Sequence, residues 1–355
     1  MATWKPDAEV QAVLEAVFAA APPGPPPAIG DIEARRTMVH GMFTGFAPPI
    51  AADIVTKNIT VTGSDGHSIP CRLYTKEAAP TNGPGVLYLH GGGYIAGGEG
   101  NGGLDLYAPF IARYVSATGV PFLQPDYRLA PEATYPTNVD DAHKALLHFF
   151  DKAGEYGVDP KRIAVMGDSG GGGLAAALVV SYPILWLIDA FGQGRHSTNH
   201  VTQHYNLEKN GPDLAKQILI YPMLDDRNTS PIQYVDEIAT WRAGDNQTGW
   251  QAVLGSLYGS ADVKPSAAPA RMTSVKGQPP AYIDTGELDI FRDEDIEYAK
   301  KLVQGGVSCE LHVYPGCVHG FEVAAPHAQV SQKAMQNRYD AIRSIAPTDS
   351  GKQKL

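Results

Sequence analysis

The chain has 355 residues, 43% of them hydrophobic, and a formal net charge of -10. This length is enough for one large buried core, and the acidic balance argues against binding to nucleic acid or to an anionic membrane surface. The longest apolar run, over residues 182–188, is too short to span a bilayer. We therefore expect one α/β domain with a smaller appendage, no nucleic-acid partner and no stable membrane insertion.

The cysteines are Cys71, Cys309 and Cys317, an odd and sparse set that does not fit a disulfide framework. Residues 1–7 lack the basic and then apolar character of a signal peptide. Both observations favour a reducing compartment, so we expect a cytoplasmic location.

The N-terminal region is predicted to form two helices before the first strand. Apolar residues between Val10 and Phe18 recur at helical spacing, and the prolines of residues 22–27 end that helix in a stiff connector. A second helical segment follows over residues 32–46. Because both helices precede the sheet, they are free to cover its edge, and we assign residues 1–50 to a helical cap.

The first strands lead into a glycine-rich motif. Alternating apolar residues around Asp65-Gly66 predict a hairpin of residues 54–61 and 69–74. A buried strand over residues 86–89 then runs into His90-Gly91-Gly92-Gly93. A glycine run alone is more often a flexible loop. Directly after a buried strand it predicts an oxyanion hole, because glycines let backbone N–H donors approach a negatively charged oxygen closely.

The next elements lead to the most informative stretch of the chain. We expect a strand over residues 122–126, a helix over 139–149, a turn over 157–160 and a strand over 162–166. Gly167-Asp168-Ser169-Gly170-Gly171 follows and matches the G-x-S-x-G nucleophile elbow. Small residues two positions either side of the serine permit a strained corner, which would lift Ser169 Oγ above the edge of the sheet.

The same letters also fit three other patterns. Gly-Asp-Ser-Gly-Gly surrounds the nucleophile of chymotrypsin-like proteases, but those are β proteins whose histidine and aspartate precede the serine. Residues 170–175 match a G-x-G-x-x-A dinucleotide fingerprint, with Asp189 near the expected distance, and a glycine-rich corner produces that match by accident. The third pattern is a glycine-rich helix entry with an idle serine, and only the other motifs of the chain argue against it.

The second half of the chain is predicted to form strands over residues 218–222, 281–284 and 307–313 and helices over residues 294–304 and 330–345. Between the first two of these strands, residues 225–258 form an excursion that contains Trp241 and Trp250. It is longer and more aromatic than a connecting helix requires. We interpret residues 225–260 as the remainder of the cap.

An exposed serine is a poor nucleophile unless a base takes its proton. His319 follows the last predicted strand, at the same end of a parallel sheet as Ser169. Without the elbow it would be read as a surface histidine; with the elbow it is the best placed base. The base needs a carboxylate to hold its tautomer, and Asp289 lies just past the preceding strand. The rivals that spacing alone does not exclude are Asp284, Glu287 and Asp293.

These motifs, in this order, resemble the hormone-sensitive-lipase family of α/β-hydrolases, which includes microbial carboxylesterases. The resemblance covers residues 50–345 and rests on residues 90–93, 126–132, 167–171, 286–289 and 319–321. It implies an α/β-hydrolase fold, with a mostly parallel central sheet flanked by helices and covered by a helical cap, and residues 51–355 forming the catalytic domain. Gly170 stands where the family usually has alanine, and Ile290 stands where proline often follows the acid. Neither departure removes a reacting group.

The resemblance also implies roles for individual residues. Ser169 is the implied nucleophile, Asp289 the acid and His319 the base, and the implied oxyanion hole is built from Gly91, Gly92, Gly93 and Gly170. The implied activity is that of a serine carboxylesterase, which hydrolyses short- to medium-chain acyl or acetyl esters of small molecules through an acyl-enzyme and needs no metal ion or organic cofactor. The last strand and helix are implied as surfaces of a homodimer.

Two alternatives to carboxylester hydrolysis stay open. Lactone or amide hydrolysis would use the same residues. The competing class is a binding module, because the plant gibberellin receptor resembles this family but lacks the catalytic histidine. The presence of His319 favours an enzyme.

Residues 180–203 do not fit the family pattern, in which a short polar connection joins the elbow helix to the next strand. Pro183 is expected to break that helix. The histidines at positions 196, 200 and 204 stand among weak helix formers, so we expect scattered histidines rather than a metal site. Splice-site sequences can encode both ends of the segment, and we interpret it as an insertion that is a translated intron. If the segment is real, we expect an exposed, poorly ordered loop.

Overall fold

The computed structural model describes residues 4–20, 25–77, 81–98, 100–191, 213–229 and 231–348. Within these residues, the chain forms a sheet of eight strands in the order β1-β2-β4-β3-β5-β6-β7-β8. The strands are β1 (Ile54–Thr62), β2 (Ser68–Lys76), β3 (Gly83–Leu89), β4 (Phe122–Pro125), β5 (Val158–Asp168), β6 (Lys216–Ile220), β7 (Ala281–Gly286) and β8 (Cys309–Tyr314).

The sheet is mostly parallel. β1 pairs with β2 and β2 with β4 in antiparallel fashion, whereas the remaining neighbours are parallel. The central strands β3, β5, β6 and β7 are buried along most of their length, as parallel strands covered on both faces require. Because parallel strands end at one edge, the loops that follow β3, β5, β7 and β8 meet there.

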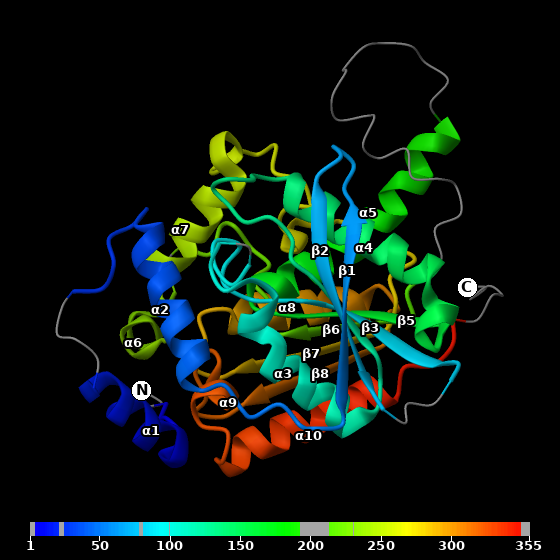
Figure 1. Cartoon of the computed structure of the whole chain (residues 1–355). Helices are drawn as coiled ribbons and strands as arrows, with labels where there is room; N and C mark the ends of the chain where they lie inside the picture. The colour runs from blue at the N-terminus through cyan, green and yellow to red at the C-terminus, as the bar shows by residue number, and fades with distance from the viewer. Residues whose placement is uncertain are drawn as a thin grey trace.

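Helices cover both faces of the sheet (Figure 1). The helices are α1 (Ala8–Ala20), α2 (Ile32–Gly45), α3 (Gly103–Thr118), α4 (Thr137–Asp151), α5 (Gly170–Phe191), α6 (Gln233–Ile238), α7 (Ala243–Leu254), α8 (Arg292–Gln304), α9 (Phe321–Ala324) and α10 (Gln329–Arg343). α3 packs against α10, and α4 packs against α5. This arrangement confirms the α/β class and the mostly parallel sheet predicted from the sequence.

The two segments predicted to form a cap contact each other. Figure 1 shows α1, α2, α6 and α7 on one side of the molecule. Arg35 Nε of α2 lies 2.9 Å from Asp245 Oδ1 of α7, and Thr248 Oγ1 of α7 accepts a hydrogen bond of 3.0 Å from Gly30 N. Arg36 Nε also donates to the carbonyl oxygen of Ile95 over 2.8 Å. The N-terminal helix α2 therefore joins α7 and the loop after β3, while the division of the chain into a cap and a catalytic domain stays a prediction.

Helix α3 was not predicted, and the limits of β5 differ from the prediction. α3 begins among glycines, with φ of 100° at Gly102 and 54° at Gly103, and contains Pro109, so its sequence looks irregular. The expected turn over residues 157–160 is only partly present. Gly157 has φ of 72°, but β5 already begins at Val158, because this residue pairs with Gly83 of β3.

The prediction that Pro183 breaks the helix after Ser169 is wrong, because α5 continues from Gly170 to Phe191. A proline inside a helix removes one backbone hydrogen bond, and the helix can bend rather than end there. Residues 192–212 lie outside the described residues, and with them the three histidines of the predicted scattered set. The interpretation of residues 180–203 as a translated intron stays a prediction.

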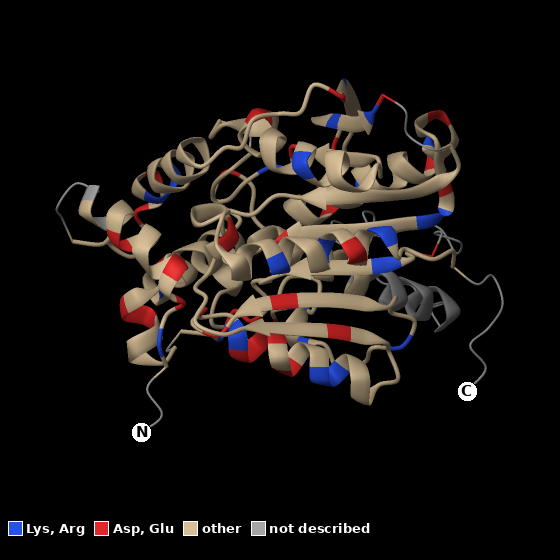
Figure 2. Ribbon diagram, turned by 90° about the horizontal axis from the view of Figure 1, so that it is seen from below, with Lys and Arg blue, Asp and Glu red and all other residues tan. Residues whose placement is uncertain are grey.

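Acidic and basic positions are interspersed along the ribbon (Figure 2). In the part of the chain that the structure describes, no helix combines the length and the apolar character needed to cross a bilayer.

Candidate active site

The corner between β5 and α5 carries Ser169 in a left-handed conformation, with φ of 55°. A β-carbon added at Gly167 would lie 2.2 Å from the carbonyl oxygen of Gly171, and one added at Gly171 would lie 2.1 Å from that of Leu89. Both positions therefore require glycine. The Ser169 amide donates to the carbonyl oxygen of Ile220 over 2.9 Å, which ties the corner to the end of β6.

The serine, histidine and aspartate predicted from the sequence lie in contact. His319 Nε2 is 3.0 Å from Ser169 Oγ, and His319 Nδ1 is 2.7 Å from Asp289 Oδ2. Asp289 is buried with an exposed fraction of 2%, and its Oδ1 accepts a hydrogen bond of 3.0 Å from Phe291 N. One carboxylate oxygen is thus held by the backbone and the other faces the imidazole.

The rival carboxylates are engaged elsewhere. Asp284 accepts two hydrogen bonds from Arg338, of 2.7 and 3.0 Å. Glu287 Oε2 accepts from the backbone of Gly316 over 2.9 Å, and Asp293 pairs with Arg292 at 2.8 Å. The structure therefore brings Asp289, and none of these three, to the ring of His319.

The glycine loop after β3 lies beside the elbow. A β-carbon added at Gly170 would be 3.0 Å from both the amide nitrogen and the α-carbon of Gly93. Gly92 and Gly93 have φ of 109° and 59°, and a β-carbon at Gly92 would lie 2.2 Å from the carbonyl oxygen of Ala96. Backbone amides of two separate loops thus come together next to Ser169, the arrangement that an oxyanion hole needs.

A family model for the alpha/beta hydrolase fold matches residues 86–323, which is more than half of the chain. The chain belongs to the α/β-hydrolases. Carboxylesterase NlhH of Mycobacterium tuberculosis is 31% identical to it over 300 residues, 82% of each chain. Ethyl acetate hydrolase of Pseudomonas putida is 30% identical over 267 residues, 74% of each chain.

A solved esterase structure is also similar to this chain. A bacterial heroin esterase, 31% identical in sequence, superposes with a TM-score of 0.79 and covers 96% of this chain and 97% of its own. Together the comparisons confirm the predicted membership of the hormone-sensitive-lipase type of α/β-hydrolase.

Gly91 was also predicted to belong to the oxyanion hole, but its environment differs from that of the other three glycines. A β-carbon added there would lie 2.5 Å from Asp168 Oδ2, so Gly91 lies against the side chain that precedes the serine. Asp168 Oδ1 in turn accepts a hydrogen bond from the hydroxyl of Tyr88. Burial raises the pKa of Asp168 to about 6, although the bond from Tyr88 opposes that rise. These contacts join the glycine loop to the elbow through the side chain of Asp168.

His90 is buried beneath the same loop. Its Nδ1 lies 2.8 Å from the carbonyl oxygen of Gly91, and its ring stacks on Tyr127 with centroids 4.3 Å apart. The hydroxyl of Tyr127 donates to the carbonyl oxygen of His90 over 2.7 Å. Burial lowers the pKa of His90 to about 4, so this ring is neutral at neutral pH. We assign it a structural part in supporting the loop.

Residues that the sequence analysis did not select surround His319. The ring of Tyr221 meets the imidazole at a centroid distance of 4.4 Å, and the ring of Phe291 meets it at 5.2 Å. Thr240 Oγ1 donates to the carbonyl oxygen of His319 over 2.6 Å. These residues come from distant parts of the chain and belong to no motif. Only Tyr221 had a signal in the sequence, because a Tyr-Pro pair stands at the end of a buried strand.

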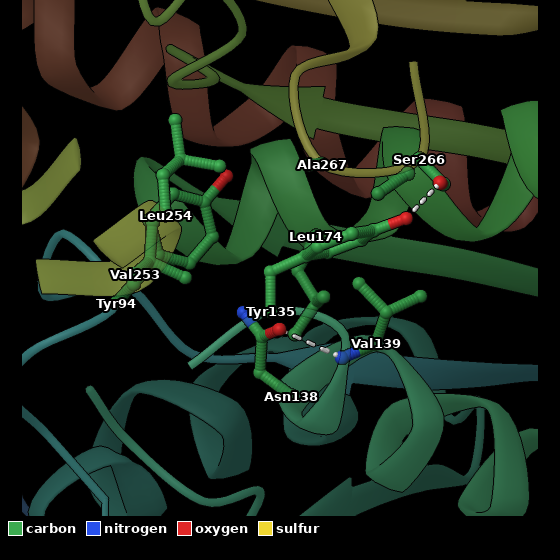
Figure 3. Close-up of a pocket in the computed structure, with 10 residues that line it drawn as sticks. Tyr94, Tyr135, Asn138, Val139, Leu174, Val253, Leu254, Ser266 and Ala267 are labelled. Carbon is green, nitrogen blue, oxygen red and sulfur yellow. Dashed lines mark hydrogen bonds between the residues drawn. The ribbon is translucent and has the colours of Figure 1, made fainter. Parts of the chain in front are cut away.

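A small cavity of this hydrolase lies beside Tyr94, the residue after the glycine loop (Figure 3). The hydroxyls of Tyr135 and Ser266 share a hydrogen bond of 2.7 Å at its wall. Ser169 and His319 are not among its lining residues, so the cavity is separate from the reacting groups. Among the residues placed by the structure, no cluster of three or more His, Cys, Asp or Glu side chains is arranged to hold a metal ion.

Proposed function

We propose that this α/β-hydrolase is a serine carboxylesterase in which Ser169, His319 and Asp289 carry the reaction. The observation that supports this most is the chain of contacts from Asp289 through His319 to Ser169, at 2.7 and 3.0 Å. Distances of this size allow proton transfer between neighbouring groups. The ester hydrolases among the relatives favour an ester as the substrate.

The first half of the reaction forms an acyl-enzyme. Ser169 Oγ attacks the carbonyl carbon of the ester while His319 Nε2 takes the hydroxyl proton. The N–H groups of Gly92, Gly93 and Gly170 stabilise the charge on the carbonyl oxygen, each worth roughly a factor of 100 to 1000 in rate. The imidazolium then gives its proton to the departing alcohol, and Asp289 stabilises its charge through Nδ1.

The second half releases the acid. A water molecule attacks the acyl carbonyl while His319 Nε2 takes one of its protons, and the same amides stabilise the second tetrahedral intermediate. Collapse of this intermediate returns the proton from His319 to Ser169 Oγ and frees the carboxylic acid. Every proton in the cycle moves through one imidazole nitrogen, and no step needs a metal ion or an organic cofactor.

We further propose short- to medium-chain acyl or acetyl esters of small molecules as substrates. Ser169 has an exposed fraction of only 6%, and residues of the predicted cap contact both His319 and the glycine loop. A narrow approach to the serine favours small acyl groups. The cap residues 1–50 and 225–260 would then decide which ester enters.

We also propose a reducing compartment and a homodimer. The described cysteines Cys71, Cys309 and Cys317 are free thiols, which fits a reducing compartment such as the cytoplasm.

The proposed homodimer concerns the edge strand β8. This strand forms one edge of the sheet and leaves Leu311 about one-third exposed, at 36%. A homodimer that pairs this edge would cover it. Light scattering of the purified protein tests the dimer, because a monomer mass would contradict it.

Hydrolysis of p-nitrophenyl esters of graded acyl length tests the proposed activity. We expect turnover that is highest with short or medium acyl chains and is lost in the Ser169→Ala variant, because no other group can form the acyl-enzyme. Equal release of p-nitrophenol by both proteins would show that Ser169 is not the nucleophile. Turnover confined to lactones or amides would keep the residues in their roles and correct the substrate class.

A further inference from the structure

The imidazole of His319 is held by more than its two hydrogen bonds. The ring of Tyr221, directly after β6, makes an edge contact with the imidazole, with a centroid distance of 4.4 Å and an angle of 62° between the planes. Phe291 makes a second edge contact at 5.2 Å and 79°. Hydrogen bonds at Nδ1 and Nε2 leave the ring free to tilt about the line that joins them, and these two aromatic rings oppose that tilt.

The backbone at Tyr221 is held in an unfavourable conformation. Its φ is 34°, in the left-handed region that non-glycine residues rarely adopt, and at this edge of the sheet it shares that property with Tyr94 and Ser169. Its amide donates to the carbonyl oxygen of Asp284 over 2.6 Å. Such conformations persist only where the surroundings enforce them, and they gather at functional sites. The position of the Tyr221 ring is therefore specified by its neighbours.

A buried ionic network holds the other end of Tyr221. Its hydroxyl donates to Glu322 Oε1 over 2.6 Å, and Arg338 Nη1 donates to the same oxygen over 2.6 Å. Arg338 also binds Asp284 through Nε and Nη2, and its guanidinium carbon lies 5.4 Å from the centroid of the Tyr221 ring. Burial acts to raise the pKa of Glu322, but Arg338 and Tyr221 outweigh it and hold that pKa below its usual value.

We propose that Tyr221 is a positioning residue for His319 and that Glu322 and Arg338 hold Tyr221 in place. The inference rests on the proposed function, because it explains how the base keeps the orientation that proton transfer from Ser169 requires. Small displacements of a reacting group cost large factors in rate. A network that joins β6, β7, α9 and α10 thus acts on the reaction without touching the substrate.

Several charged or titratable groups lie around the rings of Tyr221 and His319. They are Asp168 of β5, Asp284 of β7, Asp289 after β7, Glu322 of α9 and Arg338 of α10. The single variants below therefore each remove only one hydroxyl or one charge.

The test compares Tyr221→Phe with Tyr74→Phe in the full chain. Both tyrosines are buried and donate to a side-chain oxygen, Tyr74 to Gln124 Oε1 over 2.7 Å, but Tyr74 lies on β2, away from His319. Tyr221→Phe is expected to lower kcat about 10-fold and to change KM less than about twofold. Tyr74→Phe is expected to leave both constants unchanged at a similar loss of Tm.

Glu322→Gln and the double variant Tyr221→Phe/Glu322→Gln complete the cycle. Glu322→Gln alone is expected to lower kcat by a smaller factor with KM unchanged. Because both residues act through one contact, the double variant should lose no more than Tyr221→Phe alone. Losses that multiply would show independent effects and overturn the proposal. If Tyr221→Phe does not fold, an unchanged kcat in Glu322→Gln overturns it, and the expected loss supports it.

The wild-type protein separates this inference from the proposed function. If the wild type hydrolyses the p-nitrophenyl esters but Tyr221→Phe matches its kcat, the positioning role is wrong and the esterase function stands. If the wild type turns over no ester, lactone or amide, the proposed function itself fails, and the positioning role fails with it.

Discussion

At the scale of single residues, burial raises the pKa of an acid in the interior of this hydrolase. Asp295 of α8 is fully buried beside Thr285. Burial raises the pKa of Asp295 well above its usual value, and the nearby charges of Glu294 and Asp289 raise it further. The folded chain therefore keeps a proton that the unfolded chain releases at about pH 4. By linkage, this group makes the fold less stable as the pH rises above that value.

Asp295→Asn is expected to raise Tm relative to the wild type by an amount that grows between pH 4 and pH 8. The amide cannot ionise, so the variant loses the pH-dependent penalty and keeps a side chain of the same size. Thermal unfolding at both pH values measures the difference. A shift in Tm that is the same at pH 4 and pH 8 would show that Asp295 is ionised in the folded chain.

The residues of the site differ in how far the sequence could predict them. Ser169 and His319 follow from motifs, because the glycines around the one and the strand before the other are local in sequence. Asp289 could be ranked but not separated from Asp284, because Arg338, which engages Asp284, comes from α10, far along the chain. Tyr221 and Thr240 belong to no motif and reach His319 only through packing.

At the scale of elements, α2 is joined to α7 by a buried ion pair. The side chains of Arg35 and Asp245 have exposed fractions of 0% and 7%, and Arg35 also donates to the carbonyl oxygens of Pro27, Ala28 and Asp31. A buried charge that loses its partner is costly, since no water replaces it. The pair therefore couples the N-terminal region to the segment after β6.

Arg35→Met is expected to lower the free energy of unfolding by about 3–5 kcal/mol, because it removes the ion-pair partner of the buried Asp245, which keeps only the backbone hydrogen bond from Arg242 N. The double variant Arg35→Met/Asp245→Leu should regain much of this loss. Lys300→Ala is the control, because Lys300 and Glu297 form an exposed pair of α8 and its loss should cost less than about 1 kcal/mol. Urea unfolding measures all three. A similar cost for Arg35→Met and Lys300→Ala would show that the buried pair contributes little.

The segment between α6 and α7 lies across the site. Thr240 holds the carbonyl oxygen of His319 at 2.6 Å, and a β-carbon added at Gly93 would meet Cζ2 of the Trp241 ring at 2.4 Å. Two consecutive residues thus contact two loops of the site, Thr240 the loop of His319 and Trp241 the glycine loop after β3. Trp241 is therefore placed to limit the size of the ester.

Trp241→Ala is expected to raise kcat/KM for longer acyl chains relative to acetate by about 10-fold, because removing the indole enlarges the space over Gly93. Trp241→Phe keeps most of the ring and should keep the wild-type preference. Rates with p-nitrophenyl esters from acetate to decanoate measure the change. An unaltered order of acyl preference in Trp241→Ala would place the limit on substrate size elsewhere.

The elements of the fold were predictable to different degrees for physical reasons. The hairpin of β1 and β2 and the buried strand β3 follow from local alternation and from turn residues. α3 was missed because glycines begin it and Pro109 interrupts its pattern, and the extent of α5 was misjudged because Pro183 was given too much weight. In α3, packing against β2 and β4 overrides the local signal, whereas α5 shows that a helix can continue through a proline.

At the scale of the whole molecule, one mostly parallel sheet explains why Ser169 and His319, separated by 150 positions, meet. The loops after β5, β7 and β8 all leave the same edge, and they carry Ser169, Asp289 and His319, the proposed nucleophile, acid and base, in that order. The glycine loop after β3 arrives from the other side of β5. The order of motifs predicts this convergence, whereas the distances between the side chains depend on packing that no motif encodes.

The most direct test is mass spectrometry of the folded protein after reaction with a fluorophosphonate. We predict that one equivalent attaches to Ser169, that Ser169→Ala is not labelled, and that His319→Ala is labelled at least about 1000-fold more slowly, because the imidazole activates the hydroxyl. A folded wild-type protein that gains no mass, or a His319→Ala variant labelled at the wild-type rate, would contradict the account.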